Sequence, residues 1–155
     1  MSEIKPSNNP KDILGSNKLP YHLCPTTFIA GVGMAFLEGC LKYGRSNFRA
    51  VGVRASIYYD ACLRHLIAWF EGEDIDPESG LSHIYKAGAC LAVIADAIEC
   101  GKLNDDRMIA GGYKEVIEKF TPMIKKLKER YKDKNPKHYT IKDNDLEIIK
   151  EVNNG

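Results

Sequence analysis

The chain has 155 residues, 44% of them hydrophobic, which is enough to build the core of one compact domain. Its 22 basic and 21 acidic side chains leave a formal net charge of +1, so no overall field draws it to nucleic acid or to an anionic membrane. No apolar run reaches the roughly 18–20 residues that cross a bilayer, and the N-terminus lacks the apolar segment of a signal peptide. We therefore expect a cytoplasmic protein with neither a membrane partner nor a nucleic-acid partner.

The cysteines indicate reduced thiols. They are odd in number and contain no C-x-x-C pair, and most of them sit in apolar helical patterns. We expect small core residues at Cys24, Cys40, Cys62, Cys90 and Cys100.

The N-terminal half predicts an arm and one helix. Residues 1–17 are rich in proline, asparagine and lysine, which is typical of a loosely ordered arm. A helix is expected after Pro25, with Thr26 or Thr27 as its N-cap and Gly44 at its C-terminal end. Residues 45–53 show no helical apolar period and are expected to form a loop.

Two further helices follow. From about Arg54 the apolar residues recur close to a helical period, and Gly72 ends that helix. Ser82 is available as the N-cap of the next helix, which Gly101 terminates. Apolar residues surround most of this third helix, so we expect it at the centre of the fold.

The C-terminal part predicts a fourth helical stretch. It opens at about Asn104, is interrupted by two glycines, and resumes over 113–132, where Pro122 is expected to kink or divide it. The polar tail, 133–155, contains one apolar run at 146–152 that predicts a short helix. No alternating pattern demands a sheet, so the expected fold class is all-α: a bundle of about four to five helices in one domain, 18–132.

Four cations without an intervening acid are the most informative feature. They lie within "LKYGRSNFRAVGVR", at Lys42, Arg45, Arg49 and Arg54, with Asn47 among them. Arginine binds two phosphate oxygens at once through paired N–H groups. Glycines allow a loop to turn its backbone N–H groups toward the same phosphate. A triphosphate site is the functional interpretation; solvated charges or ion pairs with helix acids are the structural alternative.

Carboxylates that could hold Mg²⁺ are few. Glu38 lies one helical turn before Lys42, a spacing that also fits a simple ion pair. Glu71 ends the second helix, Glu78 lies in the following turn, and Asp96 stands alone in an apolar helix. These groups converge only if the helices pack side by side, as they do in a bundle.

Three blocks of sequence resemble a known family. "KYGRSNFR", "RHLIAW" and "GEDIDPESG" with a following histidine are similar to the N-terminal domain of phage-associated dATP/dGTP diphosphohydrolases, which are related to MazG-like all-α nucleotide pyrophosphohydrolases. The likeness covers about residues 18–99. It implies a helical homo-oligomer that uses Mg²⁺, with Mn²⁺ possible, to cleave a purine (deoxy)nucleoside triphosphate into monophosphate and pyrophosphate. It also implies a phage origin and hence the host cytoplasm.

The resemblance implies functional roles for the individual residues that match the family's motifs. The matching residues are Lys42, Tyr43, Gly44, Arg45, Asn47, Arg49, Arg64, His65, Trp69, Glu73, Asp76, Glu78 and His83. The MazG-like E-x-x-E ligand pattern is absent from the first helix, where position 35 is Ala and position 41 is Leu. Glu38 is the single acid there.

We predict the following roles. Phosphates and substrate are bound by Lys42, Tyr43, Arg45, Asn47, Arg49, Arg54, Arg64, His65, Trp69 and His83. Catalytic carboxylates are Glu38, Glu71 and Glu78, and the metal ligands are Glu38, Glu71, Glu78 and Asp96. Two other hypotheses remain open: a non-catalytic nucleotide-binding protein that sequesters its nucleotide, and a helical module that binds a partner protein.

Overall fold

The computed structural model describes residues 10–143 and confirms the all-α class. The elements in chain order are α1 (Pro10–Gly15), η1 (Tyr21–Leu23), α2 (Thr26–Tyr43), α3 (Asn47–Val51), β1 (Val53–Arg54), α4 (Ala55–Phe70), α5 (His83–Glu99), β2 (Leu103–Asn104), α6 (Tyr113–Arg130) and η2 (Ile141–Asp143). Within the predicted arm, residues 10–15 form α1, and the rest before Pro10 lies outside the described residues. None of the helices in residues 10–143 is long and apolar enough to cross a membrane.

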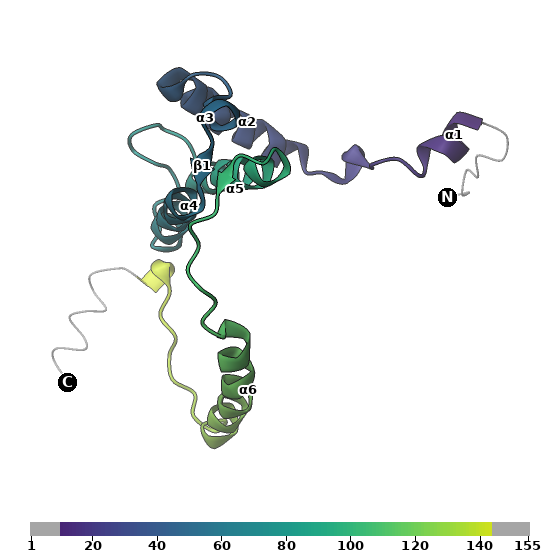
Figure 1. Ribbon diagram of the computed structural model, residues 1–155. Helices are drawn as coiled ribbons and strands as arrows, with labels where there is room; N and C mark the ends of the chain where they lie inside the picture. The colour runs from purple at the N-terminus through teal and green to yellow at the C-terminus, as the bar shows by residue number, and fades with distance from the viewer. Residues whose placement is uncertain (1–9, 144–155) are drawn as a thin grey trace, which may run out of the picture.

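Helix α5 is the centre of the fold, as predicted. It packs against both α2 and α4, and these three helices form the cluster in Figure 1. The contact between α2 and α5 is close because it is made at glycines. A Cβ at Gly31 would lie 2.4 Å from the ring of Tyr85, and one at Gly88 would lie 2.5 Å from Phe28. Larger residues at either glycine would push the two helices apart.

The helix ends follow the sequence signals in most places. The Ser82 hydroxyl accepts a hydrogen bond from the Ile84 N–H and caps α5, which confirms that prediction. Gly44 ends α2 with φ +86°, a conformation that favours glycine. The predicted threonine cap of α2 is wrong: Pro25 occupies the N-cap position, and Thr26 is already helical.

The expected loop at 45–53 is wrong, because residues 47–51 form helix α3. This helix is too short to be stable by itself, and tertiary contacts hold it. Phe48 packs on Phe36 of α2 with ring centroids 6.0 Å apart, and both contact the small core formed by Val53, Val93 and Ala97.

The expected helix start at Asn104 is also wrong. Residues 103–104 form β2, which pairs in parallel with β1 in the register Val53↔Leu103 and Arg54↔Asn104. Residues 105–112 are not helical. The Val53 N–H donates a hydrogen bond to the Lys102 carbonyl. Pairing between these two segments therefore satisfies backbone polar groups that would otherwise need hydrogen bonds within a helix.

Helix α6 is a single helix that runs through Pro122 without being divided. All of its residues are exposed, and Figure 1 shows it apart from α2, α4 and α5. The chain after it returns to the end of α4, where a Cβ on Gly72 would lie 2.2 Å from Cδ1 of Ile141. The helix predicted at 146–152 lies outside the described residues.

Candidate nucleotide site

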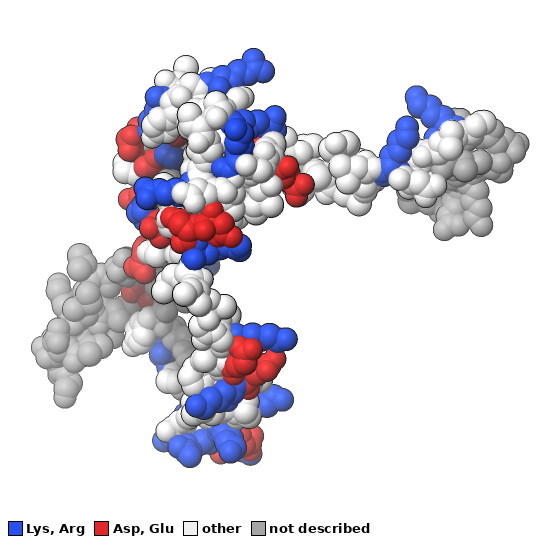
Figure 2. Space-filling model, in the orientation of Figure 1, with Lys and Arg blue, Asp and Glu red and all other residues white. Residues whose placement is uncertain are grey.

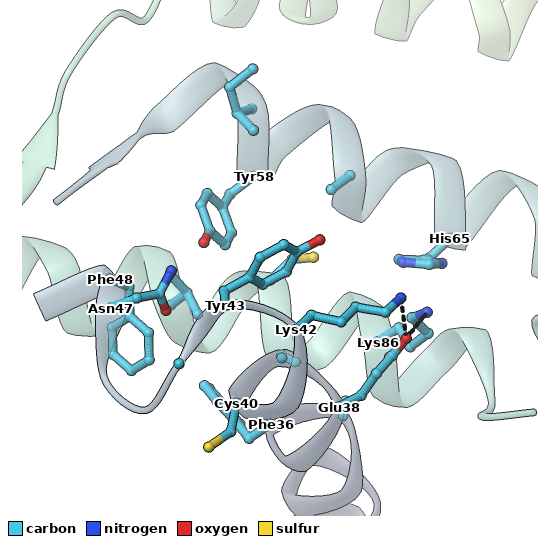
Figure 3. A pocket seen from close by; sticks show the side chains of 18 of the residues that line it. Phe36, Glu38, Cys40, Lys42, Tyr43, Asn47, Phe48, Tyr58, His65 and Lys86 are labelled. Atoms are coloured by element: carbon cyan, nitrogen blue, oxygen red, sulfur yellow. Dashed lines mark hydrogen bonds and ion pairs between the residues drawn. The ribbon is translucent and has the colours of Figure 1, made fainter. Parts of the chain in front are cut away.

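A cavity of about 770 Å³ lies between α2, α4 and α5, a size typical of small-molecule sites. Figure 3 shows this cavity, with Lys42, Lys86, Glu38 and His65 at one end. Eight of the residues predicted from sequence line it: Glu38, Lys42, Tyr43, Arg45, Asn47, Arg64, His65 and Glu78. The packing of the helices therefore brings together residues 40 positions apart in the chain.

Two lysines link three carboxylates at the polar end of the cavity. The Lys42 ammonium lies 2.7 Å from Oε1 of Glu38 and 2.8 Å from Oε1 of Glu78. The Lys86 ammonium lies 3.2 Å from Oε2 of Glu38 and 2.5 Å from Oδ2 of Asp76. Glu38 therefore contacts both lysines, and the five side chains form one network.

This network holds two of its carboxylates, those of Glu38 and Asp76, in the ionised form. The hydrogen bond from Lys42 lowers the pKa of Glu38 despite its partial burial, and Lys86 adds to the shift. Hydrogen bonds from Lys86 and Ser79 hold the pKa of Asp76 well below its ordinary value. Burial alone would lower the pKa of Lys86, but its bonds to Asp76 and Glu38 outweigh that effect, and its pKa is raised.

The other end of the cavity is aromatic. Phe36, Tyr43, Phe48 and Tyr58 line it, and Figure 3 shows Phe48 and Tyr58 on the side of Asn47, with Tyr43 in the middle of the view. Burial raises the pKa of the Tyr58 phenol, which therefore stays protonated near neutral pH. Aromatic side chains bind the faces of nucleobases by stacking. The cavity thus combines a charged end with an end suited to a flat ring.

Three side chains form a chain of contacts behind the polar end. His65 lines the cavity, and its Nδ1 lies 2.8 Å from Nδ1 of His83. Nε2 of His83 lies 2.8 Å from Oε1 of Glu73. His83 is 4% exposed, so its hydrogen bonds replace contact with water.

Several predicted residues lie outside the cavity lining. Arg49 binds Asp96 through two nitrogens, with Nε 2.9 Å from Oδ2, and this ion pair joins α3 to α5. Its guanidinium lowers the pKa of Asp96. Arg54 lines a separate cavity of about 380 Å³. Glu71 forms the C-cap of α4, and Trp69 lies beside Phe70 at the exposed end of that helix.

The structure adds residues that sequence reasoning did not select. Lys86 is the main one, and Tyr58 is another. A signal for Lys86 was present: it is the single lysine in the apolar helix α5, where an unpaired charge would be costly to bury. Asp76 is among the residues that match the family.

The charges do not separate into faces on this side of the molecule. Figure 2 shows basic and acidic side chains side by side over the α2–α5 cluster. This mixture agrees with the near-zero net charge. Selectivity for an anion must therefore come from the local arrangement in the cavity.

The carboxylates at the polar end of the cavity do not form a complete cage for a metal ion. Within residues 10–143 no group of three or more acidic, histidine or cysteine side chains is arranged to hold a metal ion. Mg²⁺ commonly binds through one or two carboxylates plus substrate phosphates. Glu38 and Glu78 both contact the Lys42 ammonium, so their oxygens already face one shared cation position.

Residues 8–107 match the family described as "dATP/dGTP diphosphohydrolase, N-terminal". The chain belongs to this family. It is similar to the dATP/dGTP diphosphohydrolase of Salmonella phage PMBT28, at 31% identity over 90 residues, which is 58% of this chain and 30% of the phage protein.

The chain thus spans about a third of the length of this curated relative. No solved structure matches it. The matched region includes the whole α2–α5 cluster and ends before α6.

Proposed function

We propose that the chain is a Mg²⁺-dependent (deoxy)nucleoside triphosphate pyrophosphohydrolase that acts in phage nucleotide metabolism in the host cytoplasm. The substrate would be a purine deoxynucleotide, since the phage relative is named for dATP and dGTP. The products would be the monophosphate and pyrophosphate. Family membership supports a reaction of this class.

The observation that carries the proposal is the division of one cavity into a charged end and an aromatic end. Lys42 at the charged end and the lining residues Arg45 and Arg64 can bind triphosphate oxygens, while the aromatic rings would hold the base. Lys42 would exchange its two carboxylate partners for phosphate oxygens. The purine would insert between rings that are already in place.

Glu38 and Glu78 are the carboxylates that would hold Mg²⁺, which would neutralise phosphate charge and lower the pKa of bound water. Lys86 would keep Asp76 and Glu38 ionised and correctly oriented. Arg45 and Arg64 would stabilise the negative charge that develops on the leaving pyrophosphate.

One observation favours a second function, a non-catalytic protein that binds and sequesters a nucleotide. Glu38 and Asp76 already have lysine partners, and in this state no acid in the network is free for a metal. A binder needs the cations and the aromatic end, and it needs no metal ligand.

The test is product analysis. The protein would be incubated with a panel of ribo- and deoxynucleoside triphosphates and Mg²⁺, and the products separated by ion-exchange chromatography. Monophosphate in equal amount with pyrophosphate supports the enzyme. Intact nucleotide that co-elutes with the protein supports sequestration, and unbound, unchanged nucleotide contradicts both functions.

A further inference from the structure

The proton positions in the contact chain Glu73–His83–His65 follow from its geometry. A carboxylate only accepts, so Nε2–H of His83 donates to Glu73, at 2.8 Å. With a single proton on the His83 ring, held at Nε2, its Nδ1 carries a lone pair. The 2.8 Å contact between the two Nδ1 atoms holds one proton, which must sit on His65.

The tautomer of His65 is therefore fixed. Its Nδ1 donates to His83, and its Nε2 carries a lone pair. Within the described part of the chain, Nε2 of His65 has no hydrogen-bond partner. Because His65 lines the cavity, this is a basic nitrogen at the polar end, where Lys42 and Lys86 also lie in Figure 3.

The hydrogen bonds behind His65 stay in place when its ring takes up a proton. If Nε2 of His65 takes up a proton, His65 keeps its Nδ1–H bond to His83, and the positive charge lies two hydrogen bonds from the Glu73 carboxylate. A carboxylate behind a histidine is the arrangement by which enzymes orient an imidazole and stabilise its charged form.

We propose that His65 accepts the proton of the attacking water, with His83 and Glu73 as positioning residues. This inference rests on the proposed hydrolase function. In the step, the water oxygen bonds to the α-phosphorus and the bond from that phosphorus to the bridging oxygen breaks. The electron pair leaves with pyrophosphate, and the water proton moves to Nε2 of His65.

The charged surroundings set the pH range in which this base works. Burial lowers the pKa of His65, and Lys86, His83 and Arg64 lower it further, while Asp76 opposes them. His65 is therefore neutral at pH 7 and able to accept a proton. The rate should fall at acid pH, as His65 becomes protonated before substrate reacts.

The experiment compares His65→Gln, Glu73→Gln and the exposed control His138→Gln, all in the full chain. Affinity is measured by calorimetry with a triphosphate whose α–β bridging oxygen is replaced by a methylene group. We expect His65→Gln to lower kcat at least 100-fold, with Kd within threefold of wild type. His138→Gln should leave both unchanged.

The pH profile separates a positioning role from a structural one. Glu73→Gln keeps the acceptor oxygen and removes the negative charge behind the histidine pair, so the acid limb of kcat/KM should move to lower pH. An unmoved limb in this variant would overturn the positioning role of Glu73.

Two further outcomes would overturn the role of His65. One, observed while the wild type turns over normally, is a kcat for His65→Gln within threefold of the wild-type value, including the case in which this variant loses only nucleotide affinity, seen as a higher Kd. The second is a ¹⁵N NMR spectrum in which Nε2 of His65, and not Nδ1, carries the proton at neutral pH. A wild-type chain that binds nucleotide without turnover would instead contradict the hydrolase function, and the base role with it.

Discussion

Lys42 follows Glu38 by one turn of α2, and its ammonium nitrogen lies 2.7 Å from Oε1 of Glu38. The same ammonium reaches Glu78, which comes from the turn before α5. An ion pair that looked local in the sequence is therefore part of a network that joins α2 to the segment between α4 and α5. The side chain of Glu38 is 19% exposed, so this pair is partly shielded from water.

Glu38→Gln separates a metal ligand from a simple ion-pair partner. It keeps the size and removes the charge that Mg²⁺ requires. We expect turnover to fall at least ~100-fold, about 2.7 kcal/mol of transition-state stabilisation, in assays with saturating Mg²⁺. The melting temperature should change little, because Asp76 still pairs with Lys86.

The matched control is Glu99→Gln, an exposed acid at the end of α5. It should behave as wild type. A Glu38→Gln rate within about twofold of wild type would assign Glu38 a purely structural role.

Arg45→Ala should weaken nucleotide binding, because Arg45 lines the cavity. The expected loss is about 1.5–3 kcal/mol, the scale of a hydrogen bond to a charged group. Isothermal titration with a non-hydrolysable triphosphate measures it. Unchanged affinity would remove Arg45 from the phosphate site.

Arg49→Ala is the matched comparison from the same stretch of sequence. Arg49 binds Asp96 and does not line the cavity, so we expect a lower melting temperature and a Kd within about threefold of wild type. A large loss of affinity in this variant would mean that the ion pair opens on nucleotide binding and that Arg49 contacts phosphate, as the sequence predicted.

Asp76→Asn should remove a pH-dependent part of the stability. The folded pKa of Asp76 is lowered, chiefly by Lys86, so its stabilisation is fully present above about pH 4, the ordinary range of Asp, and is lost as the pH falls through the folded pKa. At pH 7 the variant should lose about 2 kcal/mol of unfolding free energy.

Denaturant unfolding at pH values between 7 and 2 measures this difference. The difference in unfolding free energy between wild type and Asp76→Asn should narrow as the solution becomes acidic. A difference that stays constant with pH would contradict the ionised pair between Asp76 and Lys86.

The chain should form a homo-oligomer. Phe70 is 81% exposed, Leu41 is 79% exposed, and none of the described large side chains is fully buried, so apolar surface is left for a second copy to cover. Light scattering at micromolar concentration should give a mass well above 17.4 kDa. A monomer that persists across the concentration range would contradict this prediction.

The sequence predicted the long helices because their signals are local. The helical period, the Ser82 cap and the central position of α5 each depend on residues within one segment. Helix α3 and the pair β1–β2 could not be predicted in this way. Their stability comes from contacts with Phe36, Asp96 and Lys102, which lie outside the short segments that they stabilise.

The site was predicted only in part for the same reason. Sequence spacing identified Lys42, Arg45 and Glu38, which lie near one another in the chain. Only packing shows that Lys86 bridges Glu38 to Asp76, and that His83 lies behind His65. Conversely, Asp96 looked like an isolated acid until α3 placed Arg49 against it.

The most direct test of the hydrolase assignment follows two labels in dGTP, one on the α-phosphorus and one on the γ-phosphorus, with wild-type protein and Mg²⁺. We predict that the α label appears in dGMP and the γ label in pyrophosphate, at equal rates, with no labelled orthophosphate. Both labels remaining in intact dGTP, or the γ label appearing as orthophosphate, would contradict the account.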